Sequence, residues 1–180
     1  MGLMLERLDA KLTRWIARQP MFFVATAPSD GGRVNLSPKG HDTLRVLDES
    51  TVAYLDLTGS GVETIAHIRE NGRITVMLCA FWGPPLIVRL SGTGEVAVVG
   101  EPAFEEQRVL FPDLPGSRAV VTVHLDRVQT SCGYAVPRME LVDERDTLLT
   151  WAERKGDDGL ERYRAKKNAE SVDGVPGLLG

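Results

Sequence analysis

Six short runs of strand-forming residues follow one another between Met21 and Thr130, and turn residues separate most of them. Helical patterns occur only at the start, at two connections and at the end. The six runs are Met21–Ala27, Arg33–Ser37, Thr51–Leu57, Arg73–Phe81, Leu86–Val99 and Arg118–Thr130. Because strands and helices do not alternate, this order disfavours a doubly wound parallel sheet and a helical bundle. It predicts a mainly β (α+β) fold, an antiparallel β-barrel with flanking helices.

The helical patterns divide the chain into three predicted parts. Apolar residues at three- and four-residue spacing mark a first helix, which Pro20 ends: Leu5, Leu8, Leu12, Trp15 and Ile16. Short helices are predicted over 62–70 and 103–110, and a longer one begins near Val142. The segment 173–177 is predicted to be a loose tail. We therefore expect an N-terminal helix (1–19), a barrel (20–137) and a C-terminal helical extension with a tail (138–180).

Composition narrows the function classes. The 180 residues include 21 Lys and Arg against 25 Asp and Glu, a net charge of −4 at pH 7, which disfavours a nucleic-acid binder. No apolar run reaches the roughly 20 residues of a membrane-spanning helix, and the N-terminus lacks a signal-peptide pattern. The two cysteines and three histidines form no zinc motif. The sequence predicts a cytoplasmic protein without a metal site.

The segment Asp56–Thr64 is the first candidate site, because a strand ends there and a helix begins. Free amides at a helix start and the hydroxyls of Thr58, Ser60 and Thr64 would suit an anion such as a phosphate. The alternative is a well-capped helix without a ligand, since Ser60 and Glu63 have capping-box spacing. Glu63 would also oppose an anion. On these residues alone, the capped helix is the favoured interpretation.

The segment Arg33–His41 is the second candidate site. On a strand, Arg33, Asn35 and Ser37 share one face, and Lys39 follows just beyond. Such a row of donors would suit a polar, anionic ligand, and a solvated edge strand explains it equally well. Arg89, within a later strand, would either form an internal salt bridge or contact a phosphate or flavin oxygen, and the salt bridge is favoured.

The loop after the last strand is the third candidate. It contains Cys132, Gly133 and Tyr134, and a small loop with an aromatic residue could cover a flat ring. Cys132 has no histidine close in sequence to activate it. A buried, unreactive thiol is therefore favoured over a nucleophile.

Taken together, these segments resemble the pyridoxamine 5′-phosphate oxidase-like family of flavin-binding split barrels. The ordered set of motifs carries the resemblance, which covers roughly Pro20–Val99 and continues in element order to about Thr130. The motifs are RVNLSPK (33–39), YLDLTGSG (54–61), IRENGRITVML (68–78) and LSGTG (90–94). The ending QTSCGYAVP (129–137) looks like that of an uncharacterised branch of the family.

The resemblance implies a six-stranded split barrel that forms a homodimer, with flavin mononucleotide (FMN) held at the subunit interface. It implies a phosphate near Lys39 and the turn of Thr58, Ser60, Gly61 and Thr64. Asn35, Ser37 and Arg89 would face the ring and ribityl chain, and Cys132, Gly133 and Tyr134 the substrate side. Where the family has a basic Arg-Lys pair at the helix start, this chain has Glu63 and Thr64. The C-terminal motif of vitamin B6 oxidases is also absent.

These features predict an FMN-dependent oxidoreductase that acts on a small molecule of unknown identity. The protein would supply binding, orientation and electrostatics, and the flavin would carry the hydride. A second hypothesis is a binding or storage protein that holds a flavin, a deazaflavin or a haem without turnover. A third is a dimeric barrel that has lost its cofactor site, and Glu63 is the best support for it.

Overall fold

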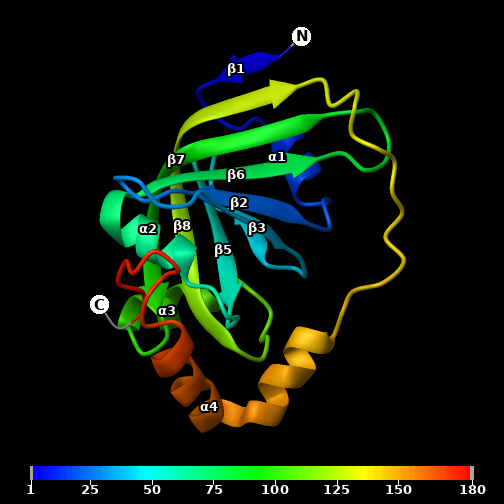
Figure 1. Cartoon of the computed structure of the whole chain (residues 1–180). Helices are drawn as coiled ribbons and strands as arrows, with labels where there is room; N and C mark the ends of the chain where they lie inside the picture. Colours follow the sequence, from blue (N-terminus) through cyan, green and yellow to red (C-terminus); the bar gives the residue numbers. More distant parts are fainter. Residues whose placement is uncertain (1, 179–180) are drawn as a thin grey trace.

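The computed structural model describes residues 2–178 as one curved antiparallel sheet with helices around it (Figure 1). Hydrogen-bonded neighbours follow the order β3–β2–β6–β7–β8–β5–β4, and β1 pairs separately with β8. The strands are β1 Leu3–Leu5, β2 Phe22–Thr26, β3 Asn35–Lys39, β4 Leu44–Val46, β5 Thr51–Leu57, β6 Arg73–Cys79, β7 Ile87–Val98 and β8 Ser117–Ser131. The helices are α1 Ala10–Ile16, α2 Glu63–Asn71, α3 Pro102–Arg108 and α4 Thr147–Lys167.

The strand number corrects the prediction of six. Seven strands lie along the main path and β1 is an eighth, while the mainly β, split-barrel class is confirmed. β1 replaces the first residues of the expected N-terminal helix. On the β5 side, β8 is paired with β5 only up to His124, so its later residues are free to pair with β1, as in Leu3 opposite Thr130. The helix starts only at Ala10, where the Asp9 carboxylate accepts a hydrogen bond from the Leu12 amide at 2.7 Å.

The barrel encloses the main apolar core. Alternate residues of β2, β5, β6, β7 and β8 point inward, and many are fully buried. Leu12 and Ile16 of α1 belong to the same cluster. Thus the N-terminal helix covers one end of the barrel, and its amphipathic spacing serves packing.

Helix α2 lies against the side of the barrel next to β2, β6 and β7 (Figure 1). Gly72 ends it in a left-handed conformation, with φ of 71°, and its amide donates to Ile68 O at 2.8 Å. The sequence predicted this end. The predicted start is wrong in one respect, because Val62 occupies the N-cap and no side chain caps the helix. The Ser60–Glu63 capping box does not form.

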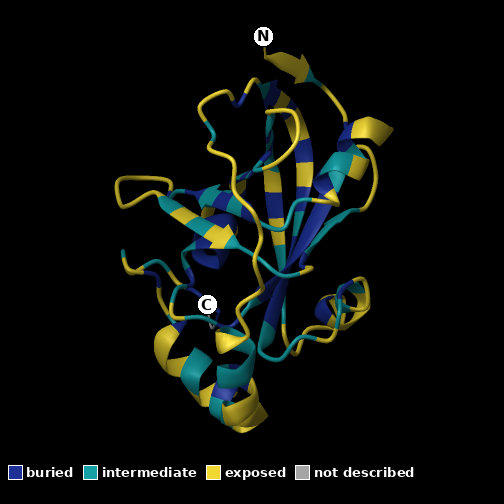
Figure 2. Cartoon of the chain, turned by 90° about the vertical axis from the view of Figure 1, so that its right-hand side faces the viewer, coloured by how far each residue is buried: buried dark blue, intermediate teal, exposed yellow. Residues whose placement is uncertain are grey.

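The C-terminal part returns to the barrel at the far end from β1 (Figure 1). An exposed connection over 132–146 leads from β8 to α4, which bends at Gly156, where φ is 62° and ψ is 173°. Figure 2 shows this connection as a mostly exposed trace. The expectation of a loose tail over 173–177 is wrong: the amide of Gly177, a buried residue, donates to Ala169 O at 2.7 Å, and the following Leu178 is buried among Val62, Ile65 and Ala119.

Candidate functional site

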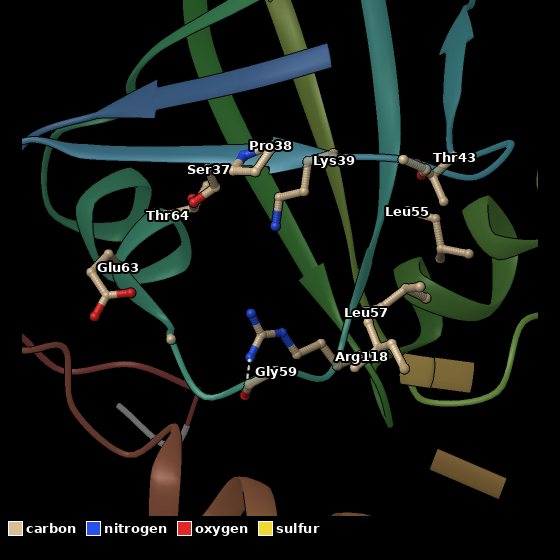
Figure 3. A pocket seen from close by; sticks show the side chains of 13 residues that line it. Ser37, Pro38, Lys39, Thr43, Leu55, Leu57, Gly59, Glu63, Thr64 and Arg118 are labelled. Atoms are coloured by element: carbon tan, nitrogen blue, oxygen red, sulfur yellow. Dashed lines mark hydrogen bonds between the residues drawn. The ribbon is translucent and has the colours of Figure 1, made fainter. Parts of the chain in front are cut away.

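A cavity of about 230 Å³ lies between β3, β5, the start of α2 and the start of β8 (Figure 3). Polar groups face one another across it, and leucines close its remaining side. Its lining comprises Ser37, Pro38, Lys39, Gly40, Thr43, Leu55, Leu57, Gly59, Gly61, Glu63, Thr64, Arg118 and Leu148. Two hydrogen-bonded groups support it, which we call the charged wall and the hydroxyl wall.

The charged wall consists of Asp56, Arg118, Lys39 and Asn168. Asp56 is 1% exposed and accepts from Lys39 Nζ at 2.6 Å and from Arg118 Nε at 2.7 Å. Burial alone would raise the pKa of the Asp56 carboxyl, but the charges and hydrogen bonds of Arg118 and Lys39 lower it to about 2. Asp56 is therefore ionised at neutral pH, and the wall carries one net positive charge.

Arg118 is the central member of this wall. Its Nη1 donates to Asn168 Oδ1 at 2.9 Å, and Asn168 Nδ2 donates to the carbonyls of Gly59 at 3.0 Å and Ser60 at 3.3 Å. No acceptor for Arg118 Nη2 occurs among residues 2–178. Figure 3 shows the guanidinium extending into the space below Lys39 and Thr64. A buried cation is thus fixed in place with donor capacity left for a ligand.

The hydroxyl wall consists of His67, Thr26, Asn35, Thr64 and Ser37. Asn35 Nδ2 donates to Thr26 Oγ1 at 3.1 Å and to Thr64 Oγ1 at 2.9 Å, and Ser37 Oγ donates to Asn35 Oδ1 at 2.9 Å. Thr26 Oγ1 lies 3.0 Å from Nδ1 of His67, a residue that is 0% exposed. The chain of hydrogen bonds therefore runs from a buried imidazole to two hydroxyls at the cavity.

Glu63 does not face these donors. Its Oε1 accepts from the backbone amide of Val172 at 3.3 Å, and Figure 3 shows its carboxylate turned away from Lys39. The first amides of α2 lack intrahelical acceptors, as at every helix start, so they add positive potential beside Thr64. The negative charge of Glu63 lies at the edge of the cavity.

The structure brings some of the expected site residues together and separates others. Ser37, Lys39, Gly61 and Thr64 line the cavity, and Asn35 lies behind two of them. Thr58 is 1% exposed and its Oγ1 accepts from Arg164 Nη1 at 3.5 Å, whereas Ser60 is exposed. Neither residue belongs to the lining.

Arg89 and the loop of Cys132, Gly133 and Tyr134 lie apart from this cavity within one chain. Arg89 Nη1 donates to Ser131 Oγ at 3.0 Å, so the favoured ion pair is replaced by a hydrogen bond to a hydroxyl. The loop follows the end of β8 opposite to Arg118. Cys132 is exposed, contrary to the expected burial, and Tyr134 is 81% exposed.

Sequence reasoning missed Arg118 and Asn168, and it gave no role to Asp56, the first residue of the first candidate segment. Arg118 lies 62 residues from Asp56 and 50 from Asn168, so no local motif links them. The one available signal was Arg118 itself, a charged residue directly before the apolar run Ala119, Val120 and Val121. A buried cation of this kind needs a partner, which predicts a carboxylate without saying which one.

The fold and the cavity define a split β-barrel with a donor-rich pocket at one end. The family model described as pyridoxamine 5′-phosphate oxidase matches residues 8–132. The pyridoxamine 5′-phosphate oxidase family protein ustO of Aspergillus flavus is 41% identical to this chain in an alignment of 195 positions. The alignment covers 99% of this chain and 78% of that protein. The chain therefore belongs to the pyridoxamine 5′-phosphate oxidase family, and the predicted resemblance is confirmed.

Solved structures share the fold. HupZ of Group A Streptococcus superposes with a TM-score of 0.52 at 25% identity, over 67% of this chain and 91% of its own. A FAD-binding protein of Mesorhizobium loti gives a TM-score of 0.50 at 14% identity, over 72% and 96% of the two chains. None of the helices within residues 2–178 has the length and apolar character needed to cross a membrane.

Proposed function

We propose that the protein binds FMN and holds its phosphate in the cavity between the two walls. The observation that carries this proposal is the Arg118 guanidinium, which is buried, fixed by Asp56 and Asn168, and open to the cavity through Nη2. A planar guanidinium suits phosphate oxygens, and charge-assisted hydrogen bonds are about twice as strong as neutral ones.

The residues present fit a phosphate. Lys39 and Arg118 outnumber the carboxylate of Asp56 within the charged wall, Glu63 adds a second carboxylate at the cavity edge, and the Thr64 hydroxyl and the α2 amides add donors. The family's Arg-Lys pair at the helix start is missing here. Arg118, which lies at the start of β8, would supply positive charge to the phosphate in place of that pair. Glu63, the main objection from the sequence, lines the edge of the cavity, but its Oε1 accepts from the Val172 amide and its carboxylate is turned away from Lys39 (Figure 3).

The size of the cavity supports a cofactor site that two subunits share. Pockets that enclose a whole cofactor-sized ligand usually measure about 300–1,000 Å³, so about 230 Å³ suits the phosphate with part of the ribityl chain. The flavin ring would then lie against a second copy of the chain. The exposed connection after β8 offers apolar residues for such a contact, namely Tyr134, Met139, Leu141 and Val142. A homodimer in analytical ultracentrifugation is the expected result.

An oxidoreductase with a small-molecule substrate is the activity we propose for the bound form. The flavin would supply hydride transfer, and the chain's own residues would bind and orient it. No His, Cys, Met or Tyr side chain lines the cavity within residues 2–178, so the usual axial ligands of a haem are absent from it. If bound flavin is reduced by neither NADH nor NADPH, the storage hypothesis is favoured.

The proposal is tested by titrating the purified protein with FMN and with riboflavin, which lacks the phosphate. We expect FMN to bind with quenched fluorescence and riboflavin to bind more weakly. Arg118→Gln should weaken FMN binding about 10- to 100-fold and affect riboflavin little, since one hydrogen bond to a charged group is lost. Arg127→Gln, at an exposed position of the same strand, is the matched control.

Two outcomes would reject the proposal. One is a wild-type protein that binds no FMN, and the other is an Arg118→Gln variant that keeps its melting temperature and its full preference for FMN over riboflavin. If that variant fails to fold, Lys39→Ala serves as the second test, because Lys39 lies at the cavity surface with 21% of its side chain exposed.

A further inference from the structure

The hydroxyl wall presents two different hydrogen-bonding groups to the cavity, although Ser37 and Thr64 carry the same functional group. Each hydroxyl has one proton to donate and two lone pairs. Ser37 donates its hydroxyl hydrogen bond to Asn35 Oδ1, so toward the cavity its oxygen can only accept a hydrogen bond. Thr64 Oγ1 accepts a hydrogen bond from Asn35 Nδ2, so its own hydroxyl hydrogen is not used within the wall.

The Asn35 amide sets the direction of these hydrogen bonds, because its Nδ2 donates to Thr26 and Thr64 while its Oδ1 accepts from Ser37. Thr26 Oγ1 accepts from Asn35, so its own proton needs another acceptor, and His67 Nδ1 at 3.0 Å is in position to accept it. This requires a neutral imidazole with its proton on Nε2, an atom that is buried and has no hydrogen-bond partner among residues 2–178. Burial lowers the pKa of His67, which favours the neutral form.

We propose that Asn35 is a positioning residue that makes Thr64 a donor and Ser37 an acceptor, so that the cavity selects a phosphorylated polyol. This inference rests on the proposed function and adds to it the chemistry that the cavity recognises. An anionic oxygen of the ligand accepts a hydrogen bond from the Thr64 hydroxyl beside Arg118, and a hydroxyl of the same ligand donates a hydrogen bond to Ser37. A ribityl phosphate carries both groups, whereas inorganic phosphate at neutral pH satisfies mainly the first.

Removal of the Thr64 donor and removal of the Ser37 acceptor should change the affinities for FMN and riboflavin in different ways. Thr64→Val removes the donor and should weaken FMN binding about tenfold while riboflavin changes less than about twofold, and Thr64→Ser should restore the FMN affinity. Ser37→Ala removes the acceptor of a ligand hydroxyl, so FMN and riboflavin should weaken by the same factor, about threefold to fivefold.

Asn35→Leu tests the positioning role. Without the amide, both hydroxyls can rotate, so the preference for FMN over riboflavin should fall by about threefold, part of the way to the Thr64→Val value. Each variant's melting temperature is measured as a check on folding. A purely structural role for Asn35 would change the two ligands equally, and that result would overturn the inference.

The inference can fail separately from FMN binding. If the wild-type protein binds FMN but Thr64→Val weakens FMN and riboflavin by the same factor, as only Ser37→Ala is expected to do, the assigned directions are wrong and the proposed function stands. If no flavin binds, ribose 5-phosphate and ribose are compared by their effect on the melting temperature. Stabilisation by the phosphorylated sugar that Thr64→Val abolishes supports the inference, and equal behaviour of the two sugars rejects it.

Discussion

The charged wall and the hydroxyl wall support the same cavity, but their members lie at different distances along the chain. The hydroxyl wall connects residues 2 to 41 positions apart, from Asn35–Ser37 to Thr26–His67. The charged wall connects Arg118 to residues 62 and 50 positions away, and Asn168 belongs to the segment after α4. The placement of Arg118 therefore depends in part on the C-terminal segment returning to the barrel, whereas the hydroxyl wall is built from the first 70 residues.

The two walls also differ in how much the free energy of unfolding falls when one member is removed. Ion pairs that are buried gain from close geometry but lose hydration, so removal of one member leaves an uncompensated charge. The hydroxyl wall buries neutral groups, and each lost hydrogen bond costs less. Four substitutions or conditions test this difference.

Asp56→Asn should have the largest effect. It leaves Arg118 and Lys39 without their shared carboxylate, and we expect the free energy of unfolding to fall by about 3 kcal/mol or more. Urea denaturation measures the change, and Asp126→Asn, at an exposed position of β8, is the control with less than about 0.5 kcal/mol. A loss below about 1 kcal/mol for Asp56→Asn would mean that the charged wall is not a coupled unit.

Asn168→Ala should have an intermediate effect on stability, about 1–3 kcal/mol, because Arg118 and two carbonyls lose a partner. It should also weaken FMN binding more than riboflavin binding, since Arg118 is no longer held in place. Val172→Ala, at a residue 65% exposed in the same segment, controls for general loosening. Unchanged FMN affinity in a destabilised Asn168→Ala protein would limit the C-terminal segment to a structural role.

Acidification should affect the hydroxyl wall through His67. Its folded-state pKa is lowered by burial, against the raising effects of Glu70, Glu63 and Asp173, so the unfolded state binds more protons. Stability is therefore complete above about pH 7 and falls as the pH drops through the unfolded value near 6.5. Urea midpoints between about pH 8 and 5.5 measure this slope. His67→Gln should flatten it and the exposed-site variant His124→Gln should not; equal slopes in both would contradict the assignment.

Glu63→Gln should have the smallest effect, a change in FMN affinity of no more than about threefold, because the carboxylate bonds to the Val172 amide away from Lys39. Titration with FMN at two salt concentrations measures it. A gain of tenfold or more would show that Glu63 opposes the phosphate as the sequence suggested, and would weaken the role assigned to Arg118.

Local patterns predicted much of the fold. β5 spans Thr51–Leu57 as expected, and Gly72 ends α2 as expected, because alternation and glycine conformation act over a few residues. β4 has only three residues, too few for a periodic signal. The buried tail was missed because its sequence is rich in turn residues, and its order comes from contacts with α2 and β8.

The candidate site divides in the same way. The segments Arg33–His41 and Asp56–Thr64 were identified from the residues, but Arg118, the buried cation that faces the cavity, was not. Glycines and hydroxyls near a turn are visible in the sequence, whereas the pairing of Asp56 with Arg118 depends on β5 lying beside β8. Register between distant strands is a tertiary property, and a single sequence does not show it.

The most direct test of the central claim is a crystal structure of the protein grown with FMN. The account predicts the phosphate between the two walls, with one oxygen within hydrogen-bond distance of Arg118 Nη2 and another accepting from Thr64 Oγ1. A phosphate bound elsewhere on the barrel, or no flavin in the crystals at saturating FMN, would contradict it.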